Sequence, residues 1–357
     1  MSSTARHSMK AVTHAAQAAG FDWAAWLPAG PSPHVDFFRD WVRDGLSGGM
    51  TWLTRSVAAR SDPRLFRPGT QSVLIAAAAY GTDDPPDAVW NDPARGRVAR
   101  FAWGEDYHRI FDKRLRALAA HLESAAPVRI LARFTDSRPV LERAWAEAGG
   151  AGIGKNTQCL LPGCGSYLLL GGLLLDSPCP DSTPAATAAP DPCGDCADCL
   201  RACPGAALVA PRRLDSRRCL SYWTIEHPGL IPPEISARMG RWIFGCDACQ
   251  EICPLVRNRT RTAQAPFLRF EPERDAPRLD AVLRMTPQDF LSRYVGCPLE
   301  RTGLSRFRRN AVVAMARSGL PEAGEALQRA ERDPDVLVAG QAALELGRIL
   351  RSQMAAP

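Results

Sequence analysis

The stretch CGDCADCLRACP, residues 193–204, decides the architecture of this chain. Its cysteines follow the spacing C-x2-C-x2-C-x3-C-P, which is typical of protein-bound [4Fe–4S] clusters. Three closely spaced thiolates fit three corners of a cubane cluster, and the fourth cysteine of this spacing reaches a second cluster. A zinc site would separate two C-x2-C pairs along the chain, so cysteines at intervals of three residues fit zinc poorly. The stretch therefore predicts iron–sulfur chemistry.

A second, incomplete run of cysteines supplies the partner cluster. Cys246, Cys249 and Cys253 repeat the last three positions of the first run, while Ile243 stands where its first cysteine would be. Cys219 lies between the two runs and is the natural substitute. Cross-ligation then assigns one cluster to Cys193, Cys196, Cys199 and Cys253, and the other to Cys203, Cys219, Cys246 and Cys249. The other cysteines are expected to be free thiols: Cys159, Cys164, Cys179 and Cys297.

The composition of the whole chain agrees with a globular protein of a reducing compartment. With 357 residues the chain is long enough for two or three domains and needs no disulfides to hold a core. No apolar run reaches the roughly 18–20 residues of a membrane span, and residues 1–10 lack the apolar segment of an export signal. We therefore expect a cytoplasmic protein without membrane contact. Its net charge of +6 permits a polyanionic partner without requiring one.

The residues before the first cysteine run alternate helical and strand patterns. Periodicity predicts helices over 9–19, 111–123 and 138–148, and buried strands over 72–80, 128–134 and 167–175. This mixture favours a layered α/β or α+β core. Residues 176–192 are rich in proline, alanine, serine and threonine, which indicates a linker. The tail after residue 279 has helical spacing, with Asp335 as the N-cap of its last helix, and favours a small helical-repeat unit.

The segment GGAGIGKN, residues 149–156, nearly matches a phosphate-binding P-loop. Asn156 replaces the magnesium-binding hydroxyl, however, and the segment follows a predicted helix where a P-loop follows a strand. We therefore favour a glycine-rich turn at which backbone amides and Lys155 meet another anionic or polar group. No dinucleotide-binding fingerprint is present, so nothing indicates a tightly bound nicotinamide or flavin adenine dinucleotide.

Asp136, in the segment FTDSRP at 134–139, allows two interpretations. Catalytic side chains are often presented where a strand ends, and a strand is predicted to end at this point. An aspartate before a helix is also a common N-cap, and the residues alone favour that role. Tyr107 and His108 lie in a polar turn before a predicted helix, where a surface or helix-start role is the simpler explanation.

Two groups of arginines lie late in the chain. Arg257, Arg259 and Arg261 form the first group, and the second group consists of Arg301, Arg306, Arg308 and Arg309. A solvated basic face is the ordinary explanation for such groups. A helical repeat with a basic face can also hold a phosphate backbone through charge alone. The residues by themselves leave both explanations open.

Taken in chain order, the motifs form a pattern that resembles the epoxyqueuosine reductases along nearly the whole length. Beyond the cysteine runs, the matching pieces are RSDP at 60–63, DYH at 106–108, FTDSRP at 134–139, IGKNT at 153–157, GSY at 165–167, CLSYWT at 219–224, GCDACQ at 245–250 and RRNA at 308–311. No single piece is decisive. Their order, together with the cysteine missing at position 243 and replaced at 219, makes the resemblance specific.

This resemblance implies an α+β protein of three parts. They are a nitroreductase-like cobalamin-binding catalytic core over 1–176, a ferredoxin-like double [4Fe–4S] module over 177–258, and a C-terminal α-helical, HEAT-like repeat over 259–357 that binds tRNA. It implies an oxidoreductase that reduces epoxyqueuosine to queuosine at the wobble position of tRNA. Electrons from an external donor would pass through two [4Fe–4S] clusters to cobalamin and convert cob(II)alamin into the nucleophilic, reducing cob(I)alamin. We expect a monomer.

The resemblance also implies roles for single residues. It makes Asp136 the catalytic proton donor to the epoxide oxygen in place of the capping role, and such an acid is expected to have a raised pKa. The side chains expected around the corrin are Arg60, Asp136, Lys155, Ser166, Ser221 and Asp247. Those expected to face the modified base are Thr224, Glu226 and His227. Arg308 and Arg309 are expected to hold the anticodon stem–loop, with the wobble base splayed from its stack.

Other classes of protein explain fewer of these features. A corrinoid iron–sulfur reductase of a small molecule, similar to the reductive dehalogenases, would share the corrin and the clusters. It would usually carry an export signal and would need no basic helical tail. An electron-transfer protein would not need the core before residue 176, and a tRNA-binding module would not need eight cluster ligands. We therefore expect reduction of an epoxide on tRNA, with the corrinoid small-molecule reductase as the alternative.

Overall fold

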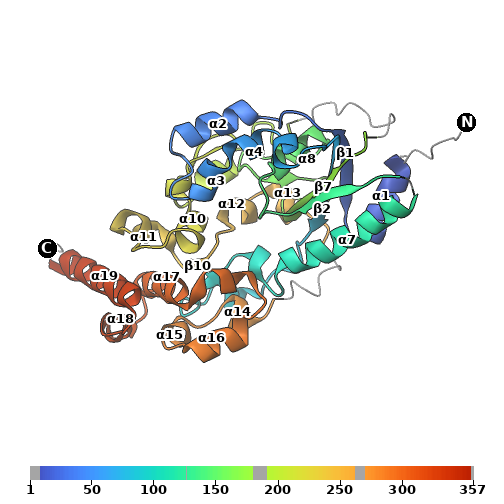
Figure 1. Ribbon diagram of the computed structural model, residues 1–357. Helices are drawn as coiled ribbons and strands as arrows, with labels where there is room; N and C mark the ends of the chain where they lie inside the picture. The colour runs from blue at the N-terminus through green and yellow to red at the C-terminus, as the bar shows by residue number, and fades with distance from the viewer. Residues whose placement is uncertain (1–8, 126, 180–190, 262–269, 355–357) are drawn as a thin grey trace, which may run out of the picture.

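The computed structural model describes residues 9–125, 127–179, 191–261 and 270–354 (Figure 1). Its centre is a four-stranded antiparallel sheet in the order β1-β2-β7-β4. The strands are β1 Trp23–Pro28, β2 Ser72–Ala79, β7 Leu168–Leu175 and β4 Ile130–Phe134. All eight residues of β2 are buried, because this strand has a neighbour on each side and helices on both faces.

Helices cover both faces of this sheet. On one face lie α1 Met9–Ala18 and the long α7 Tyr107–Ala125, and on the other lies α8 Glu142–Ala148. Gly172 of β7 is required by the close packing, since a Cβ atom there would lie 2.1 Å from the carbonyl oxygen of Leu74. The antiparallel sheet between helical layers confirms the expected α+β core.

The expected elements of this core are present, with shifted ends at two helices. The strand predicted over 72–80 is β2, the strand over 167–175 is β7, and the helix over 9–19 is α1. α7 begins four residues earlier than predicted, where the Asp106 carboxylate accepts a hydrogen bond from the His108 backbone N–H at 3.0 Å. α8 begins at Glu142 rather than at Arg138, because a residue that precedes proline disfavours the helical conformation.

The cysteine-rich region consists of short elements joined by turns. They are α9 Asp198–Ala202, β8 Leu208–Ala210, β9 Arg213–Leu214, α10 Leu220–Ile225, α11 Pro233–Met239, β10 Trp242–Phe244, α12 Ala248–Glu251 and α13 Pro254–Arg257, with a 3-10 turn over Ser216–Arg218. β10 pairs in parallel with β3 Arg97–Val98, which belongs to the N-terminal core. This pairing fixes the cysteine-rich region to the core.

The tail is helical, as expected. Its helices are α14 Pro272–Asp275, α15 Leu279–Leu283, α16 Pro287–Tyr294, α17 Gly303–Arg317, α18 Ala323–Glu331 and α19 Val336–Met354, with a 3-10 turn over Pro298–Arg301. α17 packs against α15, α18, α19 and β10, and so joins the tail to the cysteine-rich region. Asp335 caps α19, since its carboxylate accepts a hydrogen bond from the Leu337 backbone N–H at 2.9 Å.

The remaining short elements line the upper side of the molecule in Figure 1 or connect the larger ones. They are α2 Val35–Arg43, α3 Thr51–Arg55, α4 Val57–Ser61, α5 Pro63–Phe66, α6 Asp87–Trp90, a 3-10 turn over Arg100–Ala102, β5 Gly152–Ile153 and β6 Cys159–Leu160. β5 and β6 form a small hairpin that follows α8. The segment 149–156 is therefore the end of a helix followed by a hairpin, as expected for a glycine-rich turn and unlike a P-loop.

One hydrophobic core runs through all three parts of the chain. A single cluster of buried side chains extends from Val12 in α1 through Ile243 in β10 to Ala342 in α19. The boundaries at 176 and 258 remain predictions, since the parts share this core. In the described ranges, no helix combines the length and the apolar character that crossing a membrane demands.

Candidate cluster-binding and active site

Four cysteines from both runs line a single cavity of about 140 Å³. They are Cys193, Cys196, Cys199 and Cys253, the set that cross-ligation assigns to one cluster. Burial raises the pKa of the Cys199 thiol, and the neighbouring Cys193 and Cys253 raise it further. Cys196 is exposed, so the cavity has access to solvent.

The other four ligand candidates form a more enclosed set. Burial raises the pKa of both the Cys246 and Cys249 thiols well above the ordinary value, and their thiol neighbours add to it. The neighbours that raise the pKa of Cys249 include Cys219 and Cys203. Cys203 also raises the pKa of Cys219. The structure thus brings Cys203, Cys219, Cys246 and Cys249 together.

The donor sets fit iron–sulfur clusters better than single ions. Within the described ranges, no three histidine, cysteine, aspartate or glutamate residues lie close enough to hold one metal ion. A cubane cluster spreads its thiolates over four iron corners, whereas a single zinc ion gathers them around one point. Several thiolates buried together are unfavourable without a cation, and a cluster supplies that positive charge.

The turn between β5 and β6 lies across the two cysteine sets. The Lys155 backbone N–H donates to Cys193 Sγ at 3.4 Å, and Lys155 Nζ donates to the Gly194 carbonyl at 2.5 Å. Asn156 Nδ2 donates to the Cys249 carbonyl at 3.1 Å. The structure therefore places Lys155, expected beside the corrin, at the edge of the first cysteine cavity.

Two further residues expected beside the corrin, Ser166 and Asp247, share one buried partner. Ser166 Oγ donates to Gln250 Oε1 at 2.9 Å, and Gln250 Nε2 donates to Asp247 Oδ1 at 3.0 Å. Asp247 also accepts a hydrogen bond of 2.6 Å from the Arg100 backbone N–H, and burial raises its pKa. Gln250 and Arg100 were not predicted as site residues, and only the fold reveals that they bridge the core to the second cysteine set.

Asp136 stands on a sharp turn directly after β4. Its φ of 50° is in the left-handed region, and the Ser137 backbone N–H donates to the Thr135 carbonyl across it. This strained conformation is rare outside glycine and is common at functional positions. α8 begins six residues later with Leu141 at its N-cap position, so Asp136 does not cap that helix.

Three side chains from two other segments converge on the Asp136 carboxylate. Tyr107 donates its hydroxyl to Asp136 Oδ2 at 2.7 Å, and His108 Nε2 lies 3.4 Å from the same oxygen. Arg301 approaches from the tail, with its Nη1 atom 4.0 Å away. The Asp136 side chain is still 47% exposed, so the carboxylate remains open to a ligand on its free side.

In this structure the pKa of Asp136 is lowered, whereas the expected rise refers to burial against a bound corrin ring. Burial by itself would raise the pKa, but the hydrogen bonds with His108 and Tyr107 and the charges of His108 and Arg301 lower it to about 2. The carboxylate is therefore ionised at neutral pH. The donors that lower the pKa come from distant parts of the chain.

Arg60 and a second carboxyl group lie near Asp136. Arg60 is buried, with its guanidinium 5.2 Å from the centre of the Trp52 ring and donating to the Val140 carbonyl at 3.1 Å. Burial raises the pKa of Glu142 to about 7, and the charge of Asp136 contributes to that rise. Among the described residues, Glu142 Oε1 has no hydrogen-bond partner. An unsatisfied buried oxygen beside Asp136 and Arg60 fits a site that a polar ligand completes.

The residues expected to face the modified base fall in and after α10. Ser221, expected beside the corrin, lies in the first turn of this helix, two residues after Cys219. Glu226 Oε1 lies 3.4 Å from Arg301 Nη2, which connects it through Arg301 to Asp136. The His227 ring packs on Trp223, with the ring centres 4.2 Å apart.

Thr224 does not face an open site, contrary to expectation. Its side chain is fully buried and donates to the Leu220 carbonyl at 2.9 Å. The Thr224 hydroxyl also accepts a 2.9 Å hydrogen bond from the Gly245 backbone N–H. Because both hydrogen-bonding functions of the hydroxyl are used inside the protein, Thr224 ties α10 to the turn before Cys246.

Arg309 is likewise not available to a stem–loop. It is fully buried and donates to the carbonyls of Trp223, His227 and Gly229 at 2.7, 2.7 and 2.5 Å. Burial lowers its pKa to about 9. The expectation of a solvated basic face is wrong for Arg309, because this side chain lies on the buried face of α17 and binds carbonyl groups in and after α10.

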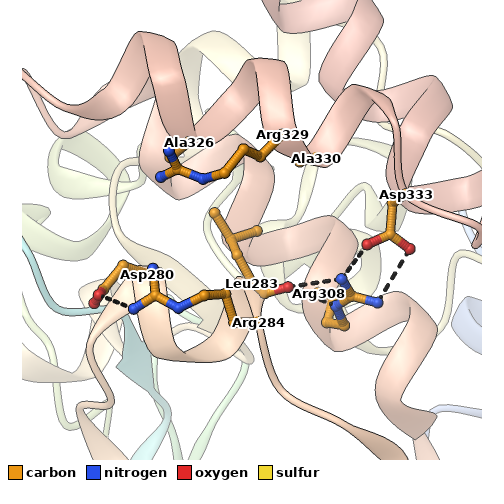
Figure 2. Close-up of a pocket in the computed structure, with 8 residues that line it drawn as sticks. All are labelled: Asp280, Leu283, Arg284, Arg308, Ala326, Arg329, Ala330 and Asp333. Carbon is orange, nitrogen blue, oxygen red and sulfur yellow. Dashed lines mark hydrogen bonds and ion pairs between the residues drawn. The ribbon is translucent and has the colours of Figure 1, made fainter.

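Arg308 is engaged inside the tail. Figure 2 shows its guanidinium paired with Asp333 and hydrogen-bonded to the Leu283 carbonyl, at the edge of a cavity of about 260 Å³. Its side chain is only 15% exposed. The expectation that Arg308 holds the phosphate backbone is therefore wrong. Its charge is paired with Asp333, and its Nε and Nη2 atoms donate to the Leu283 carbonyl.

Two family models match the chain. Residues 60–137 match the family described as epoxyqueuosine reductase QueG, DUF1730. Residues 192–255 match the family described as a 4Fe–4S double cluster binding domain. The first match ends just after Asp136, and the second covers all the cluster-ligand candidates, Cys219 included.

Curated relatives extend this likeness over most of the chain. The epoxyqueuosine reductase of Xanthomonas campestris pv. campestris is 39% identical over 304 residues, which covers 84% of each chain. The epoxyqueuosine reductase of Pseudomonas aeruginosa is 39% identical over 311 residues, covering 85% of this chain and 84% of the relative.

Solved structures are similar over nearly the full length. A crystal structure of an epoxyqueuosine reductase with an epoxyqueuosine-modified tRNA-Tyr stem loop has a TM-score of 0.85 at 27% identity, covering 96% of this chain and 90% of that one. The enzyme from Bacillus subtilis, with its aspartate catalytic loop swung out of the active site, has a TM-score of 0.82 at 26% identity with the same coverage. The order of motifs, the two cysteine sets and these likenesses agree, and the chain belongs to the epoxyqueuosine reductase family.

Proposed function

We propose that this chain reduces epoxyqueuosine to queuosine at the wobble position of tRNA, with Asp136 as the group that protonates the epoxide oxygen. The observation that carries the proposal is the arrangement of Asp136. It stands on a strained turn, half exposed, and its carboxylate is held by Tyr107 and His108. The family's curated relatives carry the name of this reaction, and one solved relative holds a modified tRNA stem loop.

The cofactors of this family are two [4Fe–4S] clusters and cobalamin. We assign one cluster to the cavity lined by Cys193, Cys196, Cys199 and Cys253, and the other to Cys203, Cys219, Cys246 and Cys249. Arg60 and Ser221 are the side chains we assign to the corrin, together with Asp136. Cobalamin, when bound, supplies a strongly reducing and nucleophilic cobalt centre.

The chain's own residues contribute binding, orientation and protons. Tyr107 and Arg301 hold the Asp136 carboxylate in place, and Glu226 in turn holds Arg301. Trp223 and His227, which flank Glu226 in the chain, bring two aromatic rings into contact, and such rings suit stacking with an unpaired base. We assign the tRNA contacts to Glu226 and His227 and to the exposed Arg301, in place of Arg308 and Arg309. We further propose that the protein works as a monomer in the cytoplasm with an external electron donor.

The test is an anaerobic assay with reconstituted clusters, added cobalamin, a strong reductant and a stem loop that carries epoxyqueuosine. Nucleoside mass spectrometry should detect the cobalamin-dependent loss of one oxygen. No conversion by protein with both clusters and the corrin bound would overturn the proposal and favour a different reducible substrate on the same scaffold.

The ligand assignment has a separate test. Cys219→Ala should lower the iron content from about eight to about four atoms per chain and leave the first cluster visible by electron paramagnetic resonance. Cys164→Ala, which removes a half-buried thiol outside both sets, is the matched control and should retain all the iron. If Cys219→Ala keeps both clusters, the assignment of Cys219 is wrong.

A further inference from the structure

The proton that Asp136 is proposed to deliver needs a source. Removing an epoxide oxygen as water leaves a carbon–carbon double bond, and the reaction consumes two electrons and two protons. An external reductant supplies the electrons, while both protons must come from the protein or the solvent. Asp136 is ionised in this structure and therefore cannot act as an acid until another group protonates it.

A chain of two side chains, Asp106 and His108, leads to the Asp136 carboxylate. Asp106 Oδ1 lies 2.7 Å from His108 Nδ1, and His108 Nε2 lies 3.4 Å from Asp136 Oδ2. The same Asp106 oxygen accepts a hydrogen bond from the His108 backbone N–H at 3.0 Å. Asp106 itself is fixed by its backbone N–H, which donates to the Gly296 carbonyl at 2.6 Å. The imidazole is thus aimed with one nitrogen at each carboxylate.

We propose that His108 is the proton source that recharges Asp136, and that Asp106 is the positioning residue that keeps the His108 ring charged and aimed at Asp136. The inference rests on the proposed function. In each turnover a proton leaves His108 Nε2 for Asp136 Oδ2, passes from Asp136 to the epoxide oxygen, and is replaced on His108 from solvent. The second proton follows the same path, so that the oxygen departs as water.

The electrostatic surroundings of His108 hold its proton on the ring in the structure without substrate, so that transfer to Asp136 becomes favourable only when a bound ligand raises the pKa of that carboxylate by burying it. Burial alone would lower its pKa, but the hydrogen bonds and charges of Asp106 and Asp136 raise it to about 9. Tyr107 stacks on the ring, and burial raises the pKa of its hydroxyl, so it stays neutral. The other charged groups that face this chain are Arg109 beside Asp106, and Arg301 and Glu142 beside Asp136. The side chain of His108 is 23% exposed, which leaves a route for protons from solvent.

The experiment measures single-turnover rates of the fully reconstituted enzyme on the modified stem loop between pH 6 and pH 10. We expect the wild-type rate to fall as the pH rises through about 9, where His108 loses its proton. His108→Gln, which keeps a hydrogen-bonding side chain, should react about 100-fold more slowly and lose this alkaline limb. His121→Gln, an exposed histidine of the same helix, is the control and should keep the wild-type profile.

Two further readouts separate a proton source from a structural residue. Imidazoles added to His108→Ala should restore the rate, and the restored rate should depend on the pKa of the imidazole that is added. A molecule that only filled the space left by the ring would restore the rate regardless of its pKa. In ¹⁵N-histidine NMR spectra of the cluster-loaded protein without substrate, the signal lost in His108→Gln should titrate near pH 9, and Asp106→Asn should move it towards about 6.5.

The outcomes are distinguishable. No turnover by the wild type at any pH overturns the proposed function, while the NMR titration still decides whether the ring is held charged. Turnover by His108→Gln with an unchanged alkaline limb overturns the relay and leaves the proposed function standing. A His108 signal that titrates near 6.5, or imidazole rescue that ignores the pKa of the base, also overturns it.

Discussion

Two clusters of charged side chains meet at the segment that follows Cys219, and they use charge in opposite ways. The Asp136 cluster reaches this segment through the ion pair between Arg301 and Glu226, and its central carboxylate is 47% exposed. The arginine cluster of α17 grips the other side of the segment, where Arg309 is fully buried and binds three backbone carbonyls. The first cluster leaves its central charge exposed, whereas the second uses its charge for hydrogen bonds within the protein.

Burial and hydrogen-bond partners, rather than residue type, therefore decide whether a charged side chain is available to a ligand. In the sequence, the arginines of α17 are the more obvious candidates for contact with a polyanion. In the fold, carbonyls of Trp223, His227 and Gly229 occupy the Arg309 guanidinium. Asp136, a residue the sequence alone assigns to a helix cap, stands open instead.

The largest expected effect is on turnover. Asp136→Asn keeps the shape of the side chain but can neither carry nor transfer the proton, so the single-turnover rate should fall by at least about 100-fold. Iron content and affinity for the stem loop should be unchanged, since the side chain is half exposed and lies outside both cysteine sets. Activity near the wild-type level would remove Asp136 from the mechanism and would show that its exposed charge has no catalytic role.

A large effect on stability is expected from Arg309→Ala. The substitution leaves three partly buried carbonyls without their donor, which should cost about 3 kcal/mol and lower the thermal midpoint by roughly 5 °C. Arg309→Lys, which keeps the charge but cannot reach all three carbonyls, should lose less. If Arg309→Ala unfolds like the wild type and binds the stem loop more weakly, the arginine is a tRNA contact after all.

A smaller effect is expected one residue earlier. Arg308→Ala breaks a mostly buried ion pair with Asp333 and should cost about 1–2 kcal/mol. A double-mutant cycle with Asp333→Ala should recover most of that cost as coupling between the two side chains. The affinity for the stem loop at low salt should stay unchanged, and a clear, salt-dependent loss of binding would argue for a phosphate contact.

A further effect concerns the pH dependence of stability. The pKa of His108 is raised to about 9 in the fold, so its charge stabilises the protein fully below the ordinary value of about 6.5 and ceases to do so as the pH passes 9. The difference in thermal midpoint between the wild type and His108→Gln should therefore be present at pH 6 and shrink by pH 10. A difference that is constant with pH would show that the ring contributes packing rather than charge.

The main strands and helices, the double-cluster region and the family could all be predicted from the sequence, which also proposes a cluster for each of eight cysteines. These features are local or ordered along the chain: ligand spacing follows the shape of a cubane cluster, and periodicity follows the geometry of strands and helices. The substitution of Cys219 for the cysteine missing at position 243 needed only the number of ligands that two clusters require.

The tertiary structure alone decided which charges are available and what protonation they carry. Tyr107, His108 and Arg301 reach Asp136 from α7 and from the tail, and their combined donors reverse the pKa shift that burial predicts. Glu142 and Gln250 likewise came to light as neighbours of the predicted site residues only in the folded structure. A pKa and an exposed surface depend on what lies nearby in space, and the folding of the chain brings together residues that no spacing in the sequence connects.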